Sequence, residues 1–182
     1  MAISSTDIVF RLSVKTGSAG DSTAQNDPNA SLGKYVSTTA LNLASPLNNL
    51  FADVSGADAQ AGRVDYRCIF VLNNHGSLTL KNPVVWIKDE VAGGANIAIS
   101  VDTTAASPKN SSQAQAKEIA NETTAPSGQS FSSPTSKEAG LALGDIPPGY
   151  VKAIWIRRTV PPGTPAKAAD GVTLRVEGDS DP

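Results

Sequence analysis

The sequence has very little of what most enzymes and metalloproteins use. Among its 182 residues there are one cysteine and one histidine, aromatic residues make up 5% and charged residues 18%. A single cysteine cannot form a disulfide within the chain, and one cysteine with one histidine is too few for a zinc site. The glycines and serines form no phosphate-binding motif and no Gly-x-Ser-x-Gly nucleophile motif. We therefore expect no catalytic residue, no cofactor and no metal.

The charge balance is close to neutral. Lysine and arginine total 15 against 17 aspartate and glutamate, a formal net charge of -2. No excess of positive charge is available to neutralise phosphates, so we expect no nucleic-acid or membrane-surface partner. The N-terminal stretch MAISSTDIVF lacks the features of a signal peptide, and no apolar run reaches the ~18 residues of a membrane span. We expect a soluble protein made in the cytosol.

Cys68 and His75 raise the question of a nucleophile and its base. They are seven positions apart, and in an extended strand that separation spans roughly 20 Å, far beyond hydrogen-bond reach. Strand alternation places Cys68 on one face with Phe70 and Leu72, so we interpret it as a small buried hydrophobic residue. His75 falls in a turn and is interpreted as a solvated loop residue.

Short alternating segments dominate the chain and predict an all-β fold. Residues 7–14 alternate apolar and polar side chains, as half-buried strands do. The same reasoning predicts strands over residues 66–73, 78–81, 84–88, 96–101, 139–143, 150–160 and 172–176. Glycine, proline and asparagine separate these segments, and no long helical pattern is present, so we predict a single antiparallel β-sandwich domain over residues 1–182.

Three stretches do not fit the strand pattern. Residues 15–33 are polar and turn-rich, and are predicted to be an extended loop or arm. Residues 103–137 are predicted to be a coil-rich excursion, and residues 178–182 a polar tail. One short helical turn is expected at residues 45–51, where Ser45 could cap and Pro46 could start it. The sequence leaves open whether residues 15–33 are ordered before assembly.

Other side chains with chemical potential are scattered. The acidic residues Asp89, Glu90, Asp102, Asp145, Asp170, Asp179 and Asp181 could bind calcium, but no Asp-x-Asp-x-Asp-Gly spacing occurs, so we interpret them as separate loop acids. Trp86 and Trp155 lie in strands and are expected in the core or its rim. Arg157, Arg158 and Arg175 could pair with acids at an interface or keep exposed strands soluble.

Several phrases resemble a family of small structural proteins in tailed bacteriophage virions. They are DIVFRLSV, NDPNASLG, VDYRCIFVLNNHGSLTLKNPVVWI, IANETTAPSGQSFSSP, LALGDIPPGYVKAIWIRRTVPPGT and VTLRVEGDS. The resemblance spans nearly the whole chain and rests on structural rather than catalytic motifs. It implies a virion component with no active-site residues.

A second resemblance concerns the fold. NNHGSLTLKNPVVWI is similar to the strand-turn-strand phrase of adhesion-type immunoglobulin-like sandwiches. The residues in comparable places are Asn74, Gly76, Thr79, Asn82 and Val84. Pro83 departs from it, because proline cannot donate to a strand ladder, so an edge position or a bulge is expected there. The resemblance implies an immunoglobulin-like β-sandwich.

Together these observations predict a non-enzymatic virion structural protein made in the host cytoplasm. A capsid decoration protein is the first expectation, because a sandwich with an arm could clamp capsid subunits. A tail, neck, baseplate or fibre-attachment component is the alternative. The expected partners are major capsid or tail proteins and further copies of the chain in a homo-oligomer. From another class, an adhesin-like module could bind a host surface through loops near His75, Gly93–Gly94 and Pro147–Pro148.

Overall fold

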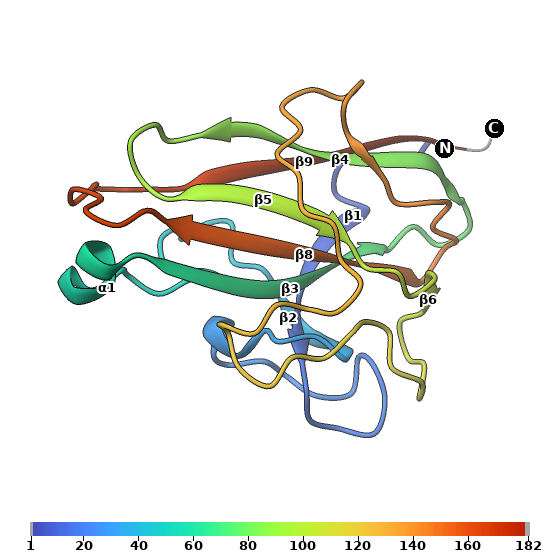
Figure 1. Ribbon diagram of the computed structural model, residues 1–182. Helices are drawn as coiled ribbons and strands as arrows, with labels where there is room; N and C mark the ends of the chain where they lie inside the picture. Colours follow the sequence, from blue (N-terminus) through green and yellow to red (C-terminus); the bar gives the residue numbers. More distant parts are fainter. Residues whose placement is uncertain (1, 181–182) are drawn as a thin grey trace.

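A computed structural model describes residues 2–180, which form two antiparallel β-sheets packed face to face (Figure 1). The first sheet has the strand order β2-β1-β3-β8-β5, with β6 paired to β8, and the second has the order β7-β4-β9. The elements are β1 (Ile8–Val14), η1 (Pro28–Ala30), β2 (Tyr35–Ala40), α1 (Gly56–Ala61), β3 (Arg63–Asn73), β4 (Leu80–Glu90), β5 (Asn96–Val101), β6 (Ser107–Pro108), β7 (Leu141–Ala142), β8 (Tyr150–Val160) and β9 (Val172–Ser180). The predicted antiparallel all-β class is confirmed.

One apolar core lies between the two sheets. Aliphatic side chains from alternate positions of β1, β3, β5 and β8 meet those of β4, and the strands' period-2 pattern puts them on one face. Its buried members include Ile69, Ile99, Ile154 and Ile156 from the first sheet, and Leu80, Val85 and Ile87 from the second.

A second core lies on the opposite face of the first sheet. Phe70 and Trp155, both 0% exposed, project there from β3 and β8. No strand covers them; instead Leu32 and Ile119 pack on them from the segments 15–33 and 103–137. The first sheet is therefore buried on both faces, and coil forms a third layer beneath it; Figure 1 shows the yellow part of this coil below β3.

Polar contacts, besides the apolar ones, hold this coil layer. The carboxylate of Asp102, which is 1% exposed, accepts hydrogen bonds from the indole Nε1 of Trp155 at 2.7 Å and from the backbone N–H groups of Lys117 at 2.9 Å and Thr104 at 2.8 Å. The ammonium of Lys152 donates to the backbone carbonyls of Asp102 and Thr104. The buried carboxylate of Asp102 thus joins two points of the coil, Thr104 and Lys117, to Trp155 in the sheet.

Residues 15–33 fold back along the edge of the first sheet. Asp21 N–H donates to the carbonyl of Val36 at 2.8 Å, and Thr38 N–H donates to the carbonyl of Thr23 at 3.0 Å. These bonds cap the outer edge of β2, so the segment is a loop with one turn of 3-10 helix, not a projecting arm. Gly33 closes it with a φ of +94°, and a Cβ there would lie 1.9 Å from the carbonyl oxygen of Lys117, so only glycine fits.

The short helix is not where the sequence analysis expected it. Residues 45–51 form bends and a turn, and Asn48 takes a φ of +57°, outside the right-handed helical region. The helix is α1 instead: Ser55 Oγ accepts from Asp58 N–H at 3.1 Å and donates to the Asp58 carboxylate at 2.7 Å. This reciprocal cap resembles a capping box.

Three further details refine the predicted strands. Residues 80–81 and 84–88 belong to the single strand β4, which residues 78 and 79 precede. This strand bulges between Lys81 and Val84, so the irregularity expected at Pro83 is confirmed. Strand β2 was not predicted at all. Residues 178–180 belong to β9 rather than to a polar tail, and the remaining tail residues, 181 and 182, lie outside the described range. Among residues 2–180, no helix is long and apolar enough to cross a membrane.

Candidate functional site

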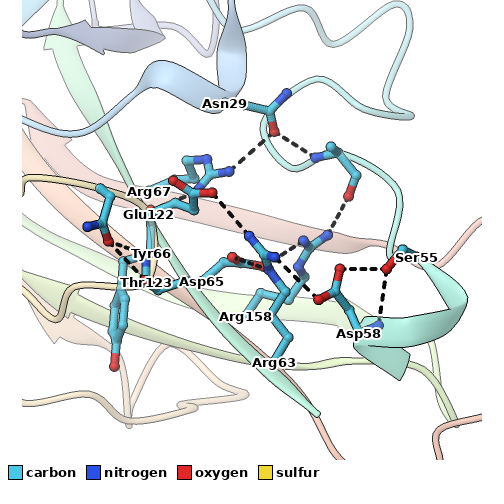
Figure 2. A network of polar contacts seen from close by, with 12 residues as sticks. Asn29, Ser55, Asp58, Arg63, Asp65, Tyr66, Arg67, Glu122, Thr123 and Arg158 are labelled. Carbon is cyan, nitrogen blue, oxygen red and sulfur yellow. Dashed lines mark hydrogen bonds and ion pairs between the residues drawn. The ribbon is translucent and has the colours of Figure 1, made fainter. Parts of the chain in front are cut away.

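Three arginines converge beside α1, at one end of the first sheet (Figure 2). Arg63 and Arg67 come from β3 and Arg158 from the neighbouring strand β8, whose register places Asp65 opposite Arg158. Their side chains face a hollow of about 420 Å³. Because these arginines line the hollow together with Asp58 and Glu122, the group is the first candidate for a functional site.

Asp65 lies at the centre of the group with a fully buried side chain. Arg63 Nε donates to one of its carboxylate oxygens at 2.7 Å, and Arg158 donates to the other at 2.7 Å. The hydrogen bond that Arg63 donates to Asp65 raises the pKa of Arg63 above its usual value. A buried carboxylate between two guanidinium groups is stable because positive charge lies on both sides of it and each of its oxygens accepts a hydrogen bond.

Arg67 is 3% exposed, yet forms no ion pair with a carboxylate among residues 2–180. It donates to the carbonyl of Tyr66 at 2.9 Å and to the side chain of Asn29 at 3.3 Å, and its guanidinium lies 5.2 Å from the ring centre of Phe51. Its Nε is buried without a hydrogen-bond partner, and burial lowers its pKa. The positive charge is held mainly by neutral oxygens and an aromatic face.

Two more carboxylates complete the group from the outside. Asp58 of α1 and Glu122 of the coil layer lie 3.4 Å and 3.1 Å from the guanidinium nitrogens of Arg63. The hydrogen bond from Ser55 lowers the pKa of Asp58. Arg63 therefore contacts carboxylates from three separate segments, and most of its donors are already used. The arrangement joins α1, β3 and the coil layer.

This group was not predicted from the sequence. Arg158 was expected to pair at an interface or to be an exposed charge, but its side chain is only 12% exposed and is paired to Asp65, because β8 lies inside the sheet. The signal was the alternation Arg63, Asp65, Arg67, which puts three ionisable side chains on one strand face. It was missed because the predicted strand began at residue 66, three residues after the start of β3.

Cys68 and His75 are not brought together. Cys68 is 0% exposed in the second core, as predicted, and burial raises the pKa of its thiol well above the usual value. His75 lies in the turn after β3, where its Nδ1 accepts hydrogen bonds from the backbone N–H groups of Ser77 and Leu78. The histidine shapes a turn.

The candidate calcium ligands are also dispersed. Within residues 2–180 no group of three or more histidine, cysteine, aspartate or glutamate side chains is placed to hold a metal ion. Glu90 accepts from Ile97 N–H, Asp145 from Asn82 N–H and Asp170 from Ala95 N–H. Each of these carboxylates fixes a different backbone segment, and Asp145 and Asp170 do so across 63 and 75 positions of the sequence.

The residues considered for ligand binding do not form one surface. Trp86 and Trp155 are 6% and 0% exposed, so neither offers a ring for sugar stacking. The turn at His75 and the Pro147–Pro148 turn lie together, since Gly149 N–H donates to the carbonyl of Asn73. The Gly93–Gly94 turn lies at the other end of the sheets, between the end of β4 and the start of β5 (Figure 1).

Comparison with known proteins adds no relative: no protein family, no curated protein and no solved structure matches the chain.

Proposed function

We propose that the chain is a non-enzymatic structural protein of a tailed bacteriophage virion, built on an immunoglobulin-like β-sandwich. The observation that carries the proposal is the resemblance described above, which extends over nearly the whole sequence. Its phrases coincide with structural elements: VDYRCIFVLNNHG forms β3 and the turn after it, and VTLRVEGDS is β9.

The architecture supports an assembly role. The coil layer and the arginine group fix the long polar loops to the first sheet, so the chain presents a rigid, weakly charged body with two sheets. Its charged hollow contains acidic and basic side chains that already neutralise one another, as in the pairs of Arg63 with Asp58 and Glu122. A body of this kind gains further stability by packing against other subunits.

Within the particle, the first proposed position is on the capsid surface as a decoration protein bound to the major capsid protein. The attachment would not use residues 15–33, since they are folded against the domain. A position in the tail, neck, baseplate or fibre attachment is the alternative.

Copy number per virion tests the proposal and its alternative. Quantitative mass spectrometry of purified virions of the phage that encodes this chain gives its ratio to the major capsid protein. A ratio near one, or a simple fraction of it, supports a decoration protein. A few copies to a few dozen support a neck, tail or fibre position, and absence from particles refutes the structural role.

A further inference from the structure

Strand β9 is an open sheet edge. It is the outermost strand of the second sheet and pairs with β4 alone. Other long edges are closed: segment 15–33 caps β2, and Ser132 exchanges hydrogen bonds of 2.8 and 3.0 Å with Ile99 beside β5. Within residues 2–180, no hydrogen bond reaches the outer edge of β9. Its nine residues include no proline and no lysine, which commonly protect such edges.

The hydrogen bonds of β4 show which backbone groups of β9 point outward. Leu143 N–H donates to the carbonyl of Pro83, and Ile87 N–H donates to the carbonyl of Pro134, both at 2.8 Å and both on the side of β4 away from β9. Because successive residues of a strand direct their backbone groups to opposite sides, Trp86 directs its groups toward β9.

The register between β4 and β9 then shows which residues of β9 direct their backbone N–H and C=O groups toward the open edge. Trp86 lies opposite Arg175, so Arg175 directs its N–H and C=O toward β4. Leu174 and Val176, on either side of it, direct theirs to the open edge. An open edge with correctly spaced donors and acceptors is a template for another strand.

We propose that β9 pairs with β9 of a second copy of this chain, antiparallel about a two-fold axis at Val176. Val176 is the midpoint of the nine-residue strand, so this register uses every residue of β9. It makes Val176 a hydrogen-bonded pair with Val176 of the second copy. The two three-stranded sheets become one continuous six-stranded sheet, with the order β7-β4-β9-β9-β4-β7.

Charge complementarity favours this register. Arg175 lies opposite Glu177 of the second copy, and Glu177 lies opposite the second copy's Arg175, in non-hydrogen-bonded pairs whose side chains approach most closely. Within one chain these two side chains already form an ion pair of 2.6 Å on one face of β9. A register centred on Arg175 or on Glu177 instead places like charges opposite each other.

The opposite face of β9 contributes apolar contact. Val172, Leu174 and Val176 pack against the core between the sheets but are only partly buried in the single chain. In the proposed dimer the Val176 side chains meet across the axis, which removes more of this apolar surface from water. The proposal concerns the purified chain and holds whether or not the chain is part of a virion.

A charge exchange tests the pairing. Sedimentation or light scattering of the wild-type chain over a concentration series is expected to show a dimer. Glu177→Arg and Arg175→Glu each place like charges in both cross-strand pairs, and are expected to weaken the dimer about 10-fold or more. The double variant Arg175→Glu/Glu177→Arg restores opposite charges and is expected to restore the dimer. Circular dichroism verifies that each variant is folded.

Cross-linking tests the register itself. Arg175→Cys and Glu177→Cys are prepared as separate proteins, with the native Cys68 buried and unreactive. Oxidation of the mixture is expected to give a covalent dimer, because residues 175 and 177 of different copies are opposite each other, while each variant alone is expected to give little. A wild-type chain that stays monomeric, a dimer insensitive to both charge changes, or equal cross-linking in the single-variant samples overturns the proposal.

Discussion

Replacing Asp102 with alanine tests whether one carboxylate anchors the coil layer. The change leaves three donors without their acceptor: the Trp155 indole and the backbone N–H groups of Lys117 and Thr104. It also removes the nearest negative charge from the ammonium of Lys152, whose pKa burial already lowers. The coil should detach from the sheet, and the chain should lose stability.

The magnitude follows from the contacts. A hydrogen bond to a charged group contributes about 1.5–3 kcal/mol, and the three are not independent, so we expect Asp102→Ala to lower the free energy of unfolding by about 3–5 kcal/mol. Asp102→Asn keeps the shape and one oxygen acceptor but places an amide N–H₂ against a donor, so about 1–2 kcal/mol is expected. Asp89→Ala makes the same alanine change at a carboxylate that is 71% exposed, and should alter stability by less than about 0.5 kcal/mol.

Urea unfolding followed by tryptophan fluorescence measures all three variants, and Trp155 reports directly on the site. If Asp102→Ala does not fold, Asp102→Asn still gives the comparison. A loss below about 1 kcal/mol for the alanine variant, or an equal loss for Asp89→Ala, would refute the reasoning.

Three further predictions concern other parts of the chain. Cys68 in the native chain should not react with a thiol reagent at pH 8, whereas the unfolded chain should react at once. Because burial raises the pKa of the folded thiol, its contribution to stability is complete below about pH 9 and is lost as the pH rises through the folded pKa. Cys68→Ala should therefore flatten the plot of urea midpoint against pH above about pH 9. Ser55→Ala removes the cap of α1 and should cost about 1 kcal/mol in the same urea assay, whereas Ser55→Asp should restore most of it. Limited proteolysis of the free chain should cut first beside the exposed Leu43 and Leu47, and earliest cleavage within 15–33 would contradict the loop contacts described here.

The strands were predictable from sequence where apolar and polar residues alternate. The bulge at Pro83 was predictable from backbone chemistry, and the burial of Cys68 from strand parity. Strand β2 was not, because its sequence YVSTTA is largely polar: Ser37 is 0% exposed, and its hydroxyl is satisfied by the carbonyl of Leu12. Such burial depends on a partner strand that local pattern does not show.

The polar networks were unpredictable for a related reason. Asp102 and Trp155 are far apart in the sequence, and Asp102 was classified as a loop acid because its environment is created by the folded coil. The same holds for Glu122, which reaches Arg63 only after the coil layer crosses the sheet. Polar side chains can be buried and stabilise the fold when backbone groups form hydrogen bonds with them, and composition alone does not reveal this.

The coil layer has a practical consequence for protein engineering. Because buried side chains and backbone hydrogen bonds hold the coil layer, many of its outward-facing side chains contribute little to stability. The turn at Ser127 and Gly128 is exposed, a Cβ on Gly128 would meet open space, and the nearby Pro126 is buried. A foreign peptide inserted between Ser127 and Gly128 should therefore be displayed on the surface with little effect on the sheets.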